Sequence, residues 1–299
     1  MSYTKKMMLL FSFVCCTAAA AAWLLFSPTL FKTTYSETFT YFPEDKQAAF
    51  SEFASEIQLL ELKDENEYIL SWGSHSKMDR QVFLLQDISL LYENGTLIGY
   101  QNVQKQHTNR VKGSAEFHGE DSGKYQAVSF HYAEVHYPND VIRSKQAMST
   151  DILYVIDSPL SPIITFKETA TSFEKRSKAL LEAIIEQQLS YSWDDLIEEY
   201  NIDRQQYYLI PLNELIDYQK NPLPSFSMEE TAVIIGKLWE GLHRYYLSGI
   251  NTFTDNAYNP IGNSLPLILL HKNGGHLIVL YETGDRTKQQ LLQLIPENK

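Results

Sequence analysis

The chain has 299 residues, with 25 Lys and Arg against 37 Asp and Glu and a formal net charge of −12. Hydrophobic residues make up 44% of the sequence and charged residues 21%, which is typical of a folded protein rather than a disordered stalk. The acidic balance argues against a protein that binds nucleic acid or an anionic surface through its overall charge.

Residues Met7 to Phe26 form an apolar run of 20 residues without a charged side chain. A helix rises about 1.5 Å per residue, so a run of this length crosses the roughly 30 Å hydrocarbon core of a bilayer. A helix also satisfies its own backbone hydrogen bonds in lipid. We therefore predict a transmembrane signal-anchor helix over residues 7–27, through which the protein contacts the lipid bilayer.

A cleaved signal peptide is the alternative interpretation of the same segment. Lys5 and Lys6 form a basic region before the run, and residues 18–22 offer small side chains for cleavage. Residues 23–26 favour the anchor, because they extend the apolar run beyond any such site.

The charges around the run predict its orientation. Lys5 and Lys6 precede it, whereas only Lys32 follows it closely, and an excess of Lys and Arg is typical of the cytoplasmic side. We therefore expect residues 1–6 in the cytoplasm and residues 33–299 outside the membrane. The exterior part then holds 22 basic and 37 acidic side chains, because three of the 25 basic residues lie before it.

Cysteine usage indicates the compartment. Both cysteines, Cys15 and Cys16, lie inside the apolar run, so the exterior part contains none. Small secreted eukaryotic domains often depend on disulfides, whereas a domain with an adequate core does not need them. This pattern favours a protein of the bacterial cell envelope.

Residues 28–66 are predicted to form a linker followed by an amphipathic helix. Pro43 suits the first position of a helix. Four apolar residues then recur at helical spacing: Phe50, Phe53, Ile57 and Leu60.

Residues 67–168 are predicted to be rich in β-strands, because short β-branched or aromatic runs alternate with turn residues. Asn94 and Gly95 stand between two such runs, which is a strong hairpin signal and explains the sequon at Asn94 as a turn. The polar segment Trp72 to Asp79 is interpreted as a turn between two strands. We expect one curved antiparallel sheet of six to nine strands that ends near two prolines in residues 157–162.

Residues 169–299 are predicted to mix helices with β-hairpins, which makes the fold class α+β. Capping boxes at Thr171 to Glu174 and Ser227 to Glu230 open two helices, and Ser192 is expected to open a third. The sequence Asn273 to Gly275 predicts a second hairpin.

The first candidate site is the pair Glu134 and His136. On a strand the two side chains share one face, while His131 points to the other face. A carboxylate and an imidazole at this spacing can supply two metal ligands or an acid–base pair, with Asp140 as a possible third ligand. The alternative is a solvated strand face without chemistry.

The second candidate site is the polar segment with His75 and Asp79 next to serines. A nucleophilic triad is defined by geometry rather than by adjacency, so a loop with local hydrogen bonds is the simpler interpretation. The Asn-rich loop 251–263 lacks the spacing of a calcium site. Tyrosine pairs at 207–208 and 245–246 fit either a sugar- or peptide-binding surface or ordinary core aromatics.

The sequence contains no Walker loop, no dinucleotide-binding fingerprint, no His-Glu-x-x-His and no cysteine-based metal spacing, so we assign no cofactor. We expect a single-pass membrane protein whose extracytoplasmic module binds or scaffolds an envelope protein or polymer, not nucleic acid. A membrane-anchored hydrolase or metal-dependent enzyme that uses Glu134 and His136 is the alternative.

Overall fold

The computed structural model describes residues 39–62, 67–158, 161–249 and 258–296. Residues Phe39–Lys299 form one compact unit, so the β-rich half and the helical half belong together. The predicted cytoplasmic segment 1–6 and anchor 7–27 lie outside the described residues. Within the described ranges, we find no helix that is both long and apolar enough to cross a membrane.

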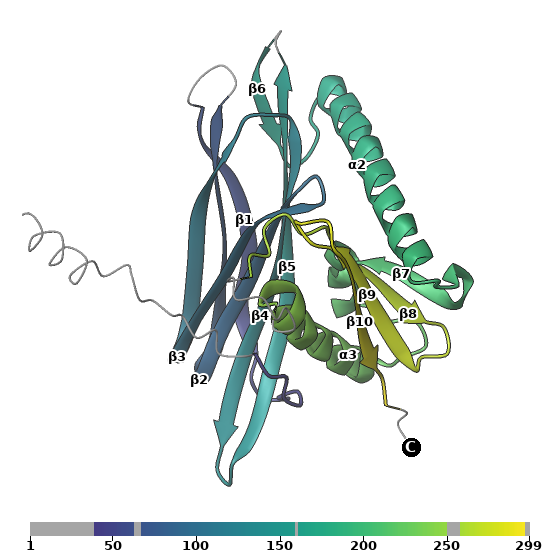
Figure 1. Ribbon diagram of the computed structural model, residues 1–299. Helices are drawn as coiled ribbons and strands as arrows, with labels where there is room; N and C mark the ends of the chain where they lie inside the picture. Colours follow the sequence, from purple (N-terminus) through teal and green to yellow (C-terminus); the bar gives the residue numbers. More distant parts are fainter. Residues whose placement is uncertain (1–38, 63–66, 159–160, 250–257, 297–299) are drawn as a thin grey trace, which may run out of the picture. The chain divides into compact units, whose positions relative to one another are not determined.

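The first half of the unit is one long antiparallel sheet (Figure 1). Its six strands are β1 (Phe50–Leu62), β2 (Tyr68–Glu93), β3 (Thr96–Gly119), β4 (Gly123–Tyr137), β5 (Val141–Ser158) and β6 (Ser161–Phe166). β2 pairs with β3 along its length, whereas its N-terminal part also pairs with β1 and its C-terminal part with β4. β5 pairs with β4 on one edge and with β6 only near its C-terminal end.

The predicted hairpin at Asn94 and Gly95 is confirmed. Asn94 has φ of 50° and Gly95 has φ of 85°, and β2 ends at Glu93 while β3 begins at Thr96. Two consecutive residues with positive φ match the right-handed twist of the flanking strands, and asparagine and glycine tolerate that conformation. The prediction of a curved antiparallel sheet is also confirmed.

The predicted helix before residue 62 is wrong, because this segment is strand β1. The chain buries Ser55 and Ile57, two residues apart, whereas Phe53 and Leu60 stay exposed. The helical spacing of the apolar residues reflects only local sequence. Hydrogen bonding to β2 along most of the segment determines the structure instead.

The predicted turn between Trp72 and Asp79 is also wrong, because β2 runs through it without a break. Ser74, Ser76 and Met78 are buried at alternate positions, as a strand requires. The hydroxyl groups of the two serines are typical of a loop, but one face of β2 here is lined by buried polar groups, as described below.

The second half adds a four-stranded antiparallel sheet and helices. Its elements are α2 (Ser172–Glu199), η1 (Arg204–Gln206), β7 (Tyr207–Pro211), η2 (Leu212–Gln219), α3 (Met228–Gly241), η3 (Leu242–Leu247), β8 (Leu267–His271), β9 (His276–Glu282) and β10 (Lys288–Leu294). Both predicted capping boxes are present, at Thr171 with Glu174 and at Ser227 with Glu230. The predicted hairpin at residues 273–275 joins β8 to β9.

The predicted helix start at Ser192 is wrong, because α2 continues through this position without interruption. Leu196 and Ile197 lie on the same helix and pack on the second sheet. The packing of this last part extends the helix, and a serine in the middle of a helix does not have to act as a cap.

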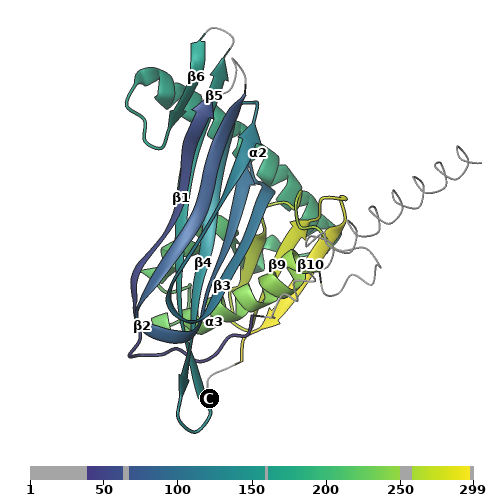
Figure 2. The same ribbon diagram turned by 90° about the vertical axis from the view of Figure 1, so that its left-hand side faces the viewer.

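The long sheet has two faces with different coverings. On one face, Phe130 stacks on Trp239 of α3 with ring centroids 5.0 Å apart, within a core that both halves of the unit share. α3 and the second sheet lie on this side of the long sheet (Figure 1). On the other face, β1 passes across β4 and β5 (Figure 2). A row of polar side chains is buried there, with Ser55 of β1 next to Ser129 of β4 and Ser149 of β5.

Candidate functional site

The free edge of β5 is the feature from which we build the site. In a strand the N–H and C=O groups of alternate residues point to the same edge. Ser144 points away from β4, because its N–H donates to Pro43 O at 2.9 Å and its C=O accepts from Asp45 N at 2.6 Å. The outward positions of β5 are therefore the even-numbered ones, up to Tyr154, which pairs with β6.

A side chain occupies the outward position in the middle of this edge. Gln219, at the end of η2, accepts from Met148 N through Oε1 at 2.6 Å and donates to Met148 O through Nε2 at 2.7 Å. Within the described residues, no hydrogen bond reaches the outward backbone groups of Gln146 and Thr150. The edge of β5 is thus open on both sides of the position that Gln219 holds.

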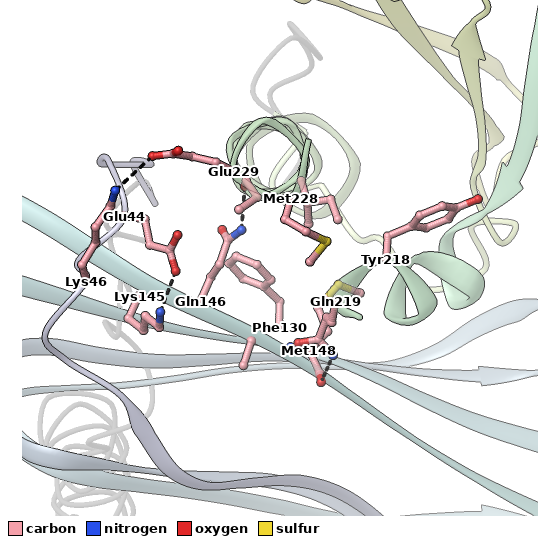
Figure 3. A pocket seen from close by; sticks show the side chains of 13 residues that line it. Glu44, Lys46, Phe130, Lys145, Gln146, Met148, Tyr218, Gln219, Met228 and Glu229 are labelled. Atoms are coloured by element: carbon pink, nitrogen blue, oxygen red, sulfur yellow. Dashed lines mark hydrogen bonds and ion pairs between the residues drawn. The ribbon is translucent and has the colours of Figure 1, made fainter. Parts of the chain in front are cut away.

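A cleft lies beside the first open position. We name it the α3 cleft, and its cavity volume is about 490 Å³. Residues of β5, η2, α3 and the N-terminal segment line it (Figure 3). Its floor is apolar, with the buried side chains of Phe130, Met148 and Ile235, and Met228 lies at its rim with 44% of its surface exposed.

Two ion pairs form the charged rim of the α3 cleft. Lys145 Nζ lies 2.6 Å from Glu44 Oε1, and Lys46 Nζ lies 3.4 Å from Glu229 Oε1 (Figure 3). Gln146 links β5 to α3 at this cleft, because its Nε2 donates a hydrogen bond to Ala232 O at 2.6 Å. The cleft thus has the character of a binding site: an apolar floor, a charged rim and one strand edge.

A second cleft lies beside the other open position. Its cavity volume is about 510 Å³, and we name it the β1 cleft because Phe53 and Ser55 of β1 line it together with Ser149 and Thr150 of β5. Ile216 and Lys220 line its η2 side. Gln219 belongs to the lining of both clefts, so it stands between them on the strand edge.

A row of buried polar side chains extends inward from the β1 cleft. Asp87 Oδ1 lies 2.9 Å from His131 Nδ1, and His131 Nε2 lies 2.7 Å from Ser149 Oγ. These distances are those of a nucleophile–base–acid relay. Beyond Ser149, the row continues through Ser55 and Ser129, each hydroxyl within hydrogen-bond distance of the next.

The donor directions in this row argue against such a relay. Ser55 donates its one proton to Ser129, so Ser149 must donate in the contact of 2.7 Å between Ser149 and Ser55. The proton between Ser149 and His131 then comes from the imidazole. A histidine that donates to a serine cannot remove the proton of that serine, so the row is a buried polar network rather than an activated nucleophile.

Asp87 anchors this network to β2. Its Oδ1 accepts a hydrogen bond from Ser76 at 2.7 Å and lies next to His131, and both Asp87 and His131 are fully buried. Such a pair stabilises the fold only as long as both partners are present.

The residues proposed from the sequence are dispersed in the structure. Glu134 and His136 share a face of β4 and contact each other, and His136 also stacks on Phe83 at 3.8 Å. His75 pairs with Glu52, and Asp79 pairs with Arg80. In the part of the chain that the structure describes, no group of three or more His, Cys, Asp or Glu is arranged to hold a metal ion.

Sequence reasoning missed the residues that form the site. Gln219, Gln146 and Met148 belong to no motif, and only the pairing of β5 with β4 reveals which backbone groups of β5 are free. Comparisons with known proteins add no further assignment: no family model, no curated protein and no solved structure matches the chain.

Proposed function

We propose that the chain is a membrane-anchored binding module that receives an extended segment of a partner protein along the free edge of β5. The observation that supports it most is the position of Gln219. Its amide makes with Met148 the two hydrogen bonds that a neighbouring strand would make. An extended peptide offers the same donor and acceptor at every second residue, so it can replace Gln219 and also pair with Gln146 and Thr150.

The surroundings of the edge fit a peptide rather than a small molecule. The two clefts flank the edge, so side chains of an added strand find a cavity on either side of Met148. The floor of the α3 cleft is apolar, which favours an apolar side chain there. Main-chain pairing supplies affinity in this mode of recognition, and the cleft supplies specificity.

The other long edge of the sheet is not equivalent. β3 pairs only with β2 over most of its length, but its residues include Lys105, Arg110 and Lys112. Charged side chains on an edge strand oppose the addition of another strand. No residue of β3 lines the two clefts at β5 or two further clefts in the described part of the chain.

The proposed location of the module rests on the sequence alone. The apolar run 7–27 and the charges around it support an anchor with residues 33–299 outside the cytoplasm. A protease added to intact cells would then digest the exterior part. Protection in intact cells with digestion after lysis would reverse the proposed orientation.

A peptide library tests the proposed function. The full chain in detergent micelles is used to select from random nine-residue peptides displayed on phage, and affinities are measured by fluorescence anisotropy. We expect the selected peptides to carry apolar residues at alternate positions. We also expect N-methylation of alternate backbone amides to abolish binding, because it removes the donors that face β5.

Two results would overturn the proposal. One is that no peptide is selected above background. The other is that N-methylated peptides bind as tightly as their parents, since recognition would then not use strand addition.

A further inference from the structure

Helix α2 presents apolar side chains on two opposite sides. One side packs inward and includes the buried Ile185 and Leu196. The other side points to solvent and carries Phe173, Leu180, Ile184 and Tyr191, which are 42%, 65%, 45% and 68% exposed. At 3.6 residues per turn these four positions lie within about 40° of one another around the helix axis. We name them the outer stripe.

The four residues of the outer stripe are aligned on one side of α2, unlike exposed apolar residues that occur singly. Single exposed apolar residues are common and need no explanation, whereas four large ones aligned along one side of a helix indicate an interaction surface. α2 lies at the outside of the unit (Figure 1), with its N-terminal half against β5 and β6 and its C-terminal part against the second sheet. Its solvent-facing side is therefore accessible along the four positions.

The spacing of the outer stripe is symmetric. The intervals between its members are seven, four and seven residues, so the stripe reads the same in both directions about position 182. In a two-fold interface, residue i of one copy contacts residue j of the other, and j contacts i. An antiparallel pair of α2 helices centred on this position places Phe173 opposite Tyr191 of the second copy, and Leu180 opposite Ile184.

The charges of α2 favour the same arrangement. Lys175, Arg176 and Lys178 against Glu174 and Glu182, the partner of Lys178, give the N-terminal end a net charge of +1. At the C-terminal end, Asp194, Asp195, Glu198 and Glu199 outnumber Arg204 and Lys288, which bind three of them, and leave a net charge of −2. Antiparallel helices place opposite charges at each end and also oppose their dipoles.

We propose that α2 is a self-association surface and that its partner is a second copy of this chain, with the two α2 helices antiparallel across the outer stripe. This inference rests on residues outside both clefts and is independent of the proposed function.

Disulfide trapping tests the register of this dimer. In a chain with Cys15→Ser and Cys16→Ser, the variants Phe173→Cys and Tyr191→Cys carry different tags and are produced together in the same membranes. We expect disulfides between the two variants. Links between identical variants are not expected, because equal positions lie 18 residues apart across the antiparallel pair, about 27 Å at 1.5 Å per residue.

A second measurement uses the mass of the complete chain in detergent. The wild type should be dimeric, and Leu180→Glu combined with Ile184→Glu should be monomeric. Leu60→Glu combined with Leu292→Glu is the matched control, because these leucines are similarly exposed, at 51% and 62%, but lie on β1 and β10. The control should stay dimeric.

The outcomes decide the inference. A monomeric wild type, a glutamate variant that stays dimeric, or links between identical positions would each overturn it. Loss of the dimer in both double variants would also overturn it, because the effect would then not be specific to α2.

Discussion

The side chain of Gln219 makes with the backbone of Met148 the two hydrogen bonds that a neighbouring strand would make. The amide of Gln219 accepts from the N–H of Met148 and donates to its C=O, at 2.6 and 2.7 Å, at a point where no strand among the described residues pairs with this edge of β5. Natural proteins protect the free edges of their sheets against unwanted pairing. Here a single removable side chain provides that protection in the middle of the edge, between two clefts.

Gln219→Ala should therefore increase the affinity for selected peptides. Gln219 competes with the peptide for Met148, and each net hydrogen bond contributes about 1 kcal/mol, so loss of the competitor should raise affinity by roughly tenfold. Gln290→Ala is the matched control, because Gln290 is an exposed glutamine on β10. Equal affinities for both variants in the anisotropy assay would show that Gln219 does not guard the edge.

Met228→Glu should weaken peptide binding without loss of stability. Met228 lines the α3 cleft and is 44% exposed, so a glutamate fits at the rim but brings a charge next to the apolar floor. We expect at least about a fivefold lower affinity, since burial or approach of an unpaired charge costs more than about 1 kcal/mol. The melting temperature of the variant, measured in parallel, should stay within a few degrees of the wild type.

Asp87→Asn should destabilise the fold strongly, because it removes one partner of a fully buried pair with His131. Breaking such a pair costs about 3–5 kcal/mol, whereas loss of the Ser149 hydroxyl removes two neutral contacts, with His131 and Ser55, at about 1 kcal/mol each. Urea denaturation followed by tryptophan fluorescence should thus rank Asp87→Asn well below Ser149→Ala. Similar unfolding free energies for the two variants would contradict our account of the polar row.

His243 should make the unit less stable in acid. Burial, with a smaller contribution from Arg244, lowers the pKa of His243 from 6.5 to about 4. Below pH 6.5 the unfolded chain binds a proton that the folded chain does not, so stability is lost as the pH falls from 6.5 towards 4. The loss is up to about 3 kcal/mol, at about 1.4 kcal/mol for each pH unit.

The comparison that isolates this effect is between pH 7 and pH 4.5. His243→Gln should lose less unfolding free energy over this interval than the wild type, whatever its stability at pH 7. The same loss in both proteins would mean that another group causes the acid sensitivity.

The fold was predictable where local chemistry decides it. The positive φ at Asn94 and Gly95 and the capping box at Thr171 depend on a few adjacent residues, so the sequence predicted them. Strand β1 depends on its pairing with β2, which a local pattern cannot show, and the spacing of its phenylalanines predicted a helix instead.

The site was less predictable than the fold, because it consists of backbone groups of β5 that have no strand partner in the described residues. His131 was correctly expected on the face of β4 opposite to Glu134, but its partners Asp87 and Ser149 come from other strands. The role of Gln219 depends on a tertiary contact between η2 and β5. No residue type or spacing in a single sequence predicts such a contact between distant elements.

Amide hydrogen exchange at Gln146 and Thr150, with and without a selected peptide, tests the central claim most directly. Both N–H groups point to the free edge of β5, so the account predicts that a bound peptide slows their exchange at least tenfold, while amides of β3 are unchanged. If the peptide binds and both amides exchange at their original rates, the partner does not add to the edge of β5, and the account is contradicted.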